Sequence, residues 1–250
     1  MKGGVIIIGS LFWDDHRNEN DSLRKNWRKN RLDIKNAFRV KLPIRYGRKS
    51  KGGEFTMVFS TRLERSSNLG IGYVIPFISN PITNYEQLEN EVLEIAKAEA
   101  LGTIENPSFF TSWGGSLGLL FNKEKVNEVQ QNSFYREWKM RYYSDKQGNS
   151  DANFSVNGER KSIKDGKLQI NWPVCVDIRD QYKLDNLEFL VGASNKPRYS
   201  NRDGQEVYKY PKIEEIALAN SKDKKRYYFL RNIESGILTF QDLRILNKMK

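Results

Sequence analysis

The chain has 250 residues, a formal net charge of +11, one histidine and a single cysteine, Cys175. This length is enough for a sizeable core, and one cysteine excludes an internal disulfide. Cysteine and histidine are too few for a zinc site built on those ligands, so a bound metal would have to use mainly carboxylates. We predict no metal and no other cofactor.

No apolar stretch approaches the roughly 18 residues that a membrane-spanning helix needs. The residues after Met1 also lack the long apolar segment and the cleavage site of a secretory signal. We therefore expect a cytoplasmic protein that makes no membrane contact. Cys175 lies in the apolar run 172–178, which favours a small buried core residue over a nucleophile.

The first predicted element is a strand at Val5 to Ile8, at the start of the stretch VIIIGSLFWDDHR. Its mostly β-branched run stops at Gly9, and an aromatic pair, two aspartates and His16 follow. A short apolar run that ends at glycine is typical of a buried strand that leads into a tight loop. Ligands often bind at such strand ends, so this loop is the first candidate for a site.

The segment from Arg17 to Lys51 carries almost all of the excess charge, with thirteen Lys and Arg against three Asp and Glu, a net +10. A local basic field attracts anions such as nucleic acid, a nucleotide or a carboxylate substrate. A solvated basic helix and loop is the alternative interpretation. The predicted helix within the segment is capped by Asp21 or Ser22.

The rest of the first half reads as strands followed by one long helix. The predicted elements are strands at 38–44, 54–60 and 70–78 and a helix at 84–101. Since strands precede the long helix and do not alternate with helices, the order favours an α+β fold over a doubly wound parallel sheet.

The second half is predicted to contain a strand, a polar helix and several turns. In chain order we expect a strand at 116–121, a helix at 123–143, an exposed loop and hairpin region at 144–168, a strand at 168–178, a turn at Asp203 and Gly204, and an apolar run at 227–230. We interpret that last run as strand core with flanking surface charge, in preference to a nucleic-acid-binding surface.

Glu99 is the candidate catalytic residue, because it falls on the apolar face of the predicted helix with Leu88, Val92 and Ile95. A carboxylate turned toward the core loses hydration, which suits it to exchange protons near neutral pH. Two structural alternatives remain open. The helix ends before Glu99, or Glu99 pairs with a buried arginine such as Arg45 or Arg48.

Taken together, these features resemble the γ-glutamylcyclotransferase-like superfamily, and the ChaC-like branch in particular. The N-terminal signature of that branch runs from a strand into Tyr-Gly-Ser-Leu and Ile-Trp, and IIGSLFW from Ile7 to Trp13 is similar, with Ile8 in place of the tyrosine. The stretch RYGRKSKGGEFTMVFS, 45–60, looks like the family's Arg- and Ser-containing strand and turn. LEIAKAE puts Glu99 at the position of the family's catalytic glutamate.

The resemblance covers about residues 5–121 and implies a small, mixed, mostly antiparallel β-barrel with flanking helices. Residues 1–125 would form this core, and residues 126–250 a C-terminal elaboration packed on the same domain. The implied ligand is a small γ-glutamyl substrate. Its carboxylate would lie on the backbone of the loop, with Arg45 or Arg48 adding charge, and the loop residues are Ile8, Gly9, Ser10 and Leu11.

The activity that the resemblance implies is release of 5-oxoproline from a γ-glutamyl amine or peptide, with Glu99 as general acid and base. The alternative is an inactive member of the same fold. Such a protein would bind nucleic acid, a nucleotide or a protein partner through Arg17 to Lys51, as a subunit of a bacterial multi-protein system. The many Lys and Asn residues are in keeping with an AT-rich bacterial genome.

Overall fold

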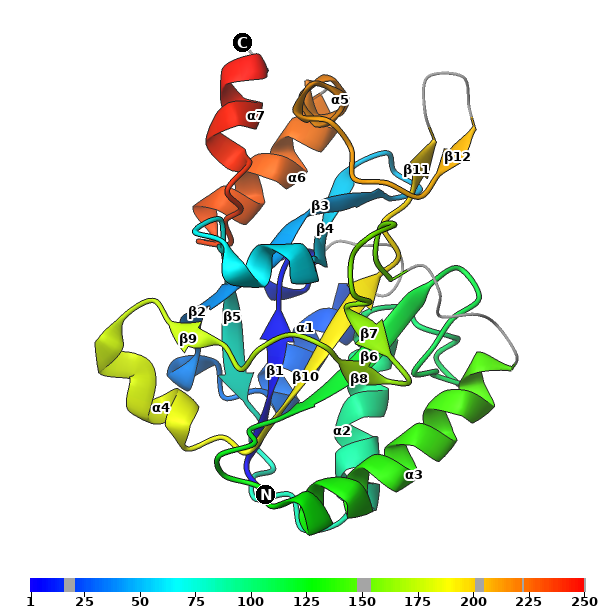
Figure 1. The fold of residues 1–250 in the computed structure, drawn as a ribbon, viewed down its shortest axis with the longest axis vertical. Coiled ribbons are helices and arrows are strands. Elements are labelled where there is room, and N and C mark those ends of the chain that lie inside the picture. The colour runs from blue at the N-terminus through cyan, green and yellow to red at the C-terminus, as the bar shows by residue number, and fades with distance from the viewer. Residues whose placement is uncertain (16–20, 148–153, 201–204, 222, 250) are drawn as a thin grey trace.

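A computed structural model describes residues 1–15, 21–147, 154–200, 205–221 and 223–249 (Figure 1). His16, Arg17 and the turn expected at Asp203 and Gly204 lie outside the described residues.

The described residues form twelve strands and seven α-helices. The strands are β1 (Gly3–Ile7), β2 (Phe38–Leu42), β3 (Ile44–Lys49), β4 (Phe55–Phe59), β5 (Gly70–Pro76), β6 (Gly115–Phe121), β7 (Ile163–Lys164), β8 (Lys167–Leu168), β9 (Val174–Cys175), β10 (Phe189–Asn195), β11 (Tyr199–Ser200) and β12 (Glu206–Val207). The helices are α1 (Asp21–Arg31), α2 (Tyr85–Ala98), α3 (Glu128–Lys146), α4 (Gln181–Asp185), α5 (Ile213–Asn220), α6 (Asp223–Glu234) and α7 (Asp242–Lys248).

Eight of the strands form one mixed sheet in the order β7-β8-β6-β10-β1-β5-β2-β9. The pairs β1–β10 and β6–β8 are parallel and the other pairs are antiparallel. The α+β class is therefore as expected. The sheet is not closed into a barrel, because its outer strands β7 and β9 do not pair with each other in the described residues.

Both halves of the chain contribute to this sheet. β10 comes from the second half and lies between β1 and β6, which both come from the first half. Every residue of β1 is buried, as expected for a central strand covered on both faces. Residues 1–125 and 126–250 thus share one sheet and one core.

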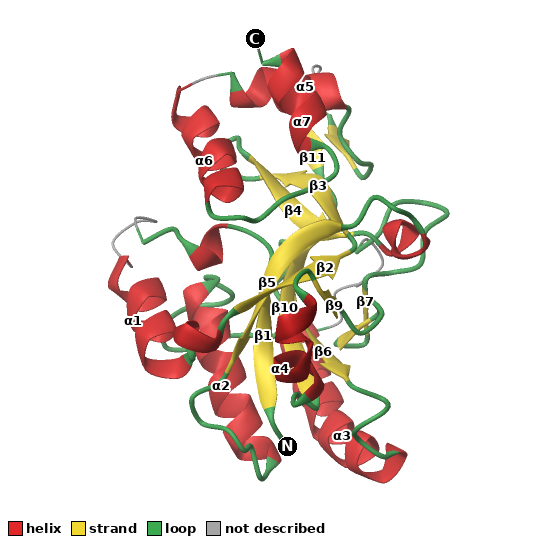
Figure 2. Ribbon diagram, turned by 90° about the vertical axis from the view of Figure 1, so that its left-hand side faces the viewer, coloured by secondary structure: helices red, strands yellow, loops and turns green. Residues whose placement is uncertain are grey.

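Helices α1 and α2 lie together on one side of the sheet (Figure 2). The hairpin β3–β4 forms a separate two-stranded sheet after Pro43, and helices α5, α6 and α7 gather at that end of the molecule (Figures 1 and 2). Tyr46 of β3 is fully buried there, against Phe229 of α6.

Local patterns predict most elements of the first half. Strand β2 alternates buried and exposed residues as expected, and Asn84 caps α2 by accepting a hydrogen bond from the N–H of Gln87 over 2.9 Å. In the second half, the strand expected at 168–178 is absent between Leu168 and Val174, and only the two-residue strands β8 and β9 remain. Proline cannot donate to a strand ladder, which agrees with the start of β9 directly after Pro173.

One further expectation for the second half is wrong, and another holds only for the β7–β8 hairpin. The apolar run 227–230 belongs to helix α6, where Phe229 and Asn232 are buried three residues apart. A run of four apolar residues does not distinguish a strand from a buried helix face. The region 144–168 is not wholly exposed either, because Phe154 and Ile163 are fully buried in the core.

Cys175 is buried, and this burial raises the pKa of its thiol to about 11.

None of the described helices has the length and apolar character needed to cross a membrane. Within the described residues, no three His, Cys, Asp or Glu side chains are grouped so that they could hold a metal ion.

Candidate active site

The loop after β1 presents free backbone donors. Gly9 leads into a short 3-10 helix, Ser10–Phe12. A side chain added at Gly9 would approach only the hydroxyl of Tyr228, at 3.8 Å, so the space beside the loop is open. No described residue accepts a hydrogen bond from the N–H groups of Ser10 and Leu11. These two donors remain available to a ligand.

A cavity of about 70 Å³ lies against this loop. Ile8, Gly9, Ser10 and Leu11 line it, together with Glu99. Since a buried water needs about 10–15 Å³ of such space, the enclosed part of the cavity can hold several waters or one end of a ligand. Two of the three segments on which the resemblance rests, represented by residues 8–11 and by Glu99, therefore border the same space.

Sheet topology explains why the second half of the chain also reaches the cavity. Strands β1 and β10 run parallel, with Ile6 level with Gly192, so both strands end at the same edge of the sheet. At that edge, Ser194 and Asn195, the last two residues of β10, line the cavity beside the loop. Strand β4, helix α6 and the segments that follow α2 supply further lining residues, among them Met57, Leu101, Trp113 and Tyr228.

Glu99 lies at the end of its helix and not in the core. Helix α2 ends at Ala98, Glu99 is its C-cap residue, and Ala100 then adopts a left-handed conformation with φ of 55°. The side chain of Glu99 is 26 % exposed. Leu88, Val92 and Ile95 are fully buried as expected, but the apolar face stops one turn before Glu99.

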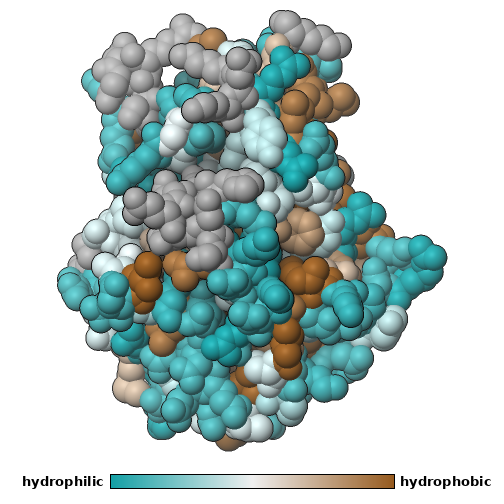
Figure 3. Space-filling view, turned by 180° about the vertical axis from the view of Figure 1, so that it is seen from behind, coloured by the Kyte–Doolittle hydropathy of each residue, from teal (hydrophilic) through white to brown (hydrophobic). Residues whose placement is uncertain are grey.

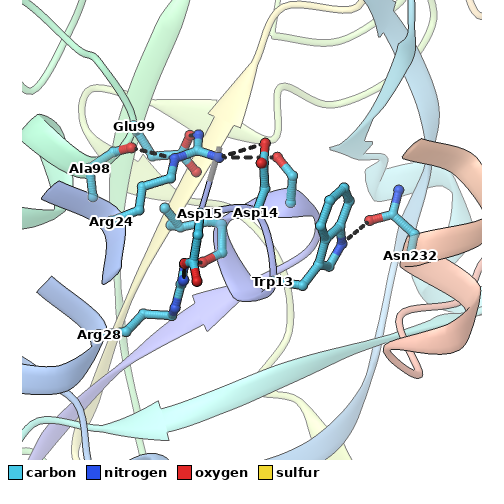
Figure 4. A network of polar contacts seen from close by, with 10 residues as sticks. Trp13, Asp14, Asp15, Arg24, Arg28, Ala98, Glu99 and Asn232 are labelled. Atoms are coloured by element: carbon cyan, nitrogen blue, oxygen red, sulfur yellow. Dashed lines mark hydrogen bonds and ion pairs between the residues drawn. The ribbon is translucent and has the colours of Figure 1, made fainter. Parts of the chain in front are cut away.

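A buried arginine, Arg24 of α1, provides the countercharge for Glu99 (Figure 4). Its Nη2 lies 3.6 Å from Glu99 Oε2, and its Nη1 lies 3.4 Å from both Asp14 Oδ2 and Ser10 Oγ. Its Nε donates to the carbonyl of Ala98 over 2.9 Å. Glu99 thus pairs with an arginine, as one alternative anticipated, but the partner is neither Arg45 nor Arg48.

Two more contacts hold the loop in place. Arg28 of α1 donates to the carbonyl of Leu11 over 2.6 Å and also pairs with Asp15. Trp13 Nε1 donates to Asn232 Oδ1 over 2.9 Å, which ties the loop to helix α6 (Figure 4). The loop is therefore fixed between α1 and α6, and a loop held in this way can present its N–H groups in one orientation.

Arg45 and Arg48 do not line the cavity. Arg45 lies 4.0 Å from the ring centroid of Tyr210, and its burial lowers the pKa of its guanidinium. Arg48 stacks 5.0 Å from the centroid of Trp113, a cavity residue, and donates to the Trp113 carbonyl over 3.2 Å. Burial and then the nearby Arg198 lower the pKa of Arg48 to about 10. Arg48 is therefore separated from the cavity by Trp113, and Arg45 contacts different neighbours.

Sequence reasoning missed Ser194, Asn195, Trp113 and Tyr228. One signal was present: LEFLVGASN, 187–195, is an apolar run that ends in small and polar residues, like the run that ends at Gly9. Nothing in the local sequence indicates that these two strands are neighbours, because their pairing joins the first and second halves of the chain.

Comparison of the chain with protein-family models, curated proteins and solved structures found no match.

Proposed function

We propose that the chain is a γ-glutamylcyclotransferase-like enzyme that releases 5-oxoproline from a γ-glutamyl amine or peptide. The observation that carries this proposal is that the Gly9–Leu11 loop and Glu99 line the same cavity. The eight-stranded sheet is open, so the proposal rests on the site and not on a closed barrel. Ile8 has no phenol to offer where the ChaC-like signature has tyrosine, so the loop would act through its backbone.

In the proposed reaction, the N–H groups of Ser10 and Leu11 bind the α-carboxylate of the substrate. Glu99 takes a proton from the α-amine as that nitrogen attacks the γ-carbonyl carbon. The same carboxyl then gives the proton to the departing amine, so it ends the cycle ionised. Arg24 contacts both Glu99 and Ser10 and would hold the base and the loop at a fixed separation.

The test compares wild type with Glu99→Gln for release of 5-oxoproline from a panel of γ-glutamyl amines, amino acids and peptides. Loss of a positioned acid and base is expected to lower kcat by about 100-fold or more. Glu94→Gln is the matched control, because Glu94 lies on the same helix, pairs with Lys97 and does not line the cavity. The control should keep its rate within about twofold.

Thermal melts of all three proteins accompany the assay. A Glu99→Gln protein that melts like wild type and turns over the panel at the wild-type rate would remove Glu99 from the mechanism. A wild-type protein that releases no 5-oxoproline from any panel member would overturn the proposed activity.

A second candidate function is binding of nucleic acid by an inactive member of the fold. Two observations favour it: Glu99 is ion-paired, as a structural acid would be, and seven of the basic residues that the structure describes between Asp21 and Lys51 are exposed. They are Lys25, Lys29, Lys35, Arg39, Lys41, Lys49 and Lys51. Arg24 and Arg28, in contrast, are buried in structural contacts, so the net +10 overstates the exposed charge.

This second function is tested with fluorescent DNA and RNA oligonucleotides. Binding through exposed phosphate contacts should weaken by orders of magnitude between about 50 mM and about 200 mM salt. The paired substitution Lys25→Glu and Lys29→Glu on α1 should abolish it. An affinity that changes neither with the salt concentration nor with these substitutions would contradict the proposed binding surface.

A further inference from the structure

Ser194 carries a buried hydroxyl that the fold itself does not use. The residue is 3 % exposed, and its Oγ has no hydrogen-bond partner in the described residues. A buried polar group is normally paired, so an unpaired one calls for a functional explanation. Ser194 lines the cavity that also contains Glu99, which points to a ligand as the missing partner.

The other serine and threonine hydroxyls of the described lining already have hydrogen-bond partners. Ser10 Oγ accepts from Arg24 over 3.4 Å, and Thr56 Oγ1 donates to the carbonyl of Arg48 over 3.3 Å. The Tyr228 side chain packs against Trp13, with ring centroids 5.4 Å apart. Ser194 is thus the serine or threonine of the described lining whose hydroxyl has no hydrogen-bond partner, as donor or as acceptor.

The register places this hydroxyl close to the loop. The parallel pairing of β1 with β10 ends with Ile6 level with Gly192, and Ser194 and Ile8 each follow two residues later on their own segments and both line the cavity. Ser194 therefore lies beside the start of the loop, on a central strand of the sheet and not on a surface loop. A donor on such a strand is preorganised, which is what stabilisation of a transient charge requires.

We propose that Ser194 Oγ–H donates a hydrogen bond to the γ-carbonyl oxygen of the substrate as that oxygen becomes negatively charged. This inference rests on the proposed function. The α-amine nitrogen forms a bond to the γ-carbon, and the carbonyl electron pair moves onto the oxygen while Glu99 takes the amine proton. The pair then returns, the bond to the leaving amine breaks and Glu99 protonates that amine. Ser194 keeps its proton throughout and stabilises the intermediate oxyanion.

The experiment measures kcat and KM of Ser194→Ala for the γ-glutamyl compound that wild type turns over fastest, with thermal melts of each protein. Removal of one oxyanion donor lowers kcat by about 100-fold, with KM within about twofold, because the bond strengthens only in the transition state. The melting temperature should stay equal or rise, since an unpaired buried hydroxyl is removed.

Ser116→Ala is the matched control. Ser116 is level with Ser194 on the neighbouring strand β6 and is fully buried, but its hydroxyl lies 3.4 Å from Tyr142 Oη and it does not line the cavity. This variant should keep kcat and KM within about twofold of wild type.

Equal losses of kcat in the two serine variants would mean a general packing effect and would overturn the inference. A raised KM at unchanged kcat in Ser194→Ala would also overturn it, because the hydroxyl would then bind the ground state. Both of these results leave the proposed activity standing. If wild type turns over no γ-glutamyl compound, the proposed function fails and the role of Ser194 fails with it.

Discussion

Arg24 connects the charged groups around the candidate site. One guanidinium lies within 3.6 Å of Glu99 and within 3.4 Å of both Asp14 and Ser10, and it is almost completely buried. A buried cation of this kind is stable only with partners close by. The loop and the end of α2 are therefore coupled through a single side chain.

Asp242 is a carboxyl group near full burial, outside the cavity lining, and its burial makes the stability of the fold depend on pH. Its two carboxyl oxygens accept from the N–H of Thr239 over 2.6 Å and from the Thr239 hydroxyl over 2.9 Å. Burial nevertheless outweighs these bonds and raises the pKa of Asp242 to about 6. The folded state therefore holds a proton at this carboxyl in a pH range where the unfolded chain has lost it.

Because the folded-state pKa is the higher one, the stabilising contribution is complete below about pH 4 and is lost as the pH rises through about 6. Relative to Asp242→Asn, the wild-type free energy of unfolding should fall by up to about 3 kcal/mol between pH 4 and pH 7. Urea denaturation of both proteins at a series of pH values measures this difference. A difference that is constant over that range would show that Asp242 does not titrate as described.

Among the elements, the β7–β8 hairpin is held against helix α3 by its two-residue turn. Asp165 and Gly166 both have positive φ, 54° and 73°, as a two-residue hairpin turn requires. Gly166 also packs so closely that an added Cβ would lie 2.6 Å from Trp138 Nε1, and its carbonyl accepts from that nitrogen over 2.8 Å. The turn thus fastens the hairpin to helix α3.

Gly166→Ala should lower the free energy of unfolding by about 2 kcal/mol more than Gly158→Ala does. Both glycines have positive φ, 73° and 81°, so both substitutions strain the backbone. At Gly158, however, the nearest atom to the added Cβ is 3.9 Å away, on Arg62, so only Gly166→Ala also creates a clash. Chemical denaturation of the two variants measures the difference, and equal destabilisation would contradict the close packing.

At the scale of the whole molecule, β10 is the strand that makes the two halves interdependent. It pairs with β1 on one side and with β6 on the other. Its residues Phe189, Leu190 and Val191 are fully buried. Without β10, strands β1 and β6 would each expose an unpaired edge in the middle of the sheet.

The molecular surface is mostly hydrophilic on the face shown in Figure 3, where hydrophobic residues lie in separate spots.

We therefore expect a fragment of residues 1–125 to lack a cooperative fold. Its circular dichroism and amide proton spectrum should show no native-like tertiary structure, whereas the full chain melts in one transition. Addition of the fragment 126–250 should restore structure if the two pieces can pair β1 with β10. A folded 1–125 fragment would show that the first half has a core of its own.

The sequence by itself determined the elements that depend on near neighbours. Alternation defines β2, the cap at Asn84 defines the start of α2, and the apolar run before Gly9 defines β1 and the loop that follows it. Glu99 and the loop could also be named as site residues, since each stands at the end of a regular pattern. These features are readable because side-chain periodicity and capping act over only a few residues.

Only the tertiary structure decided which distant segments meet. The parallel pairing of β1 with β10 brings Ser194 to the loop, α1 carries Arg24 to Glu99, and α6 contributes Tyr228. Arg45 and Arg48, which the resemblance marks as substrate-binding residues, lie outside the cavity lining. Strand order and helix docking depend on burial of surface summed over the whole core, which no local pattern encodes.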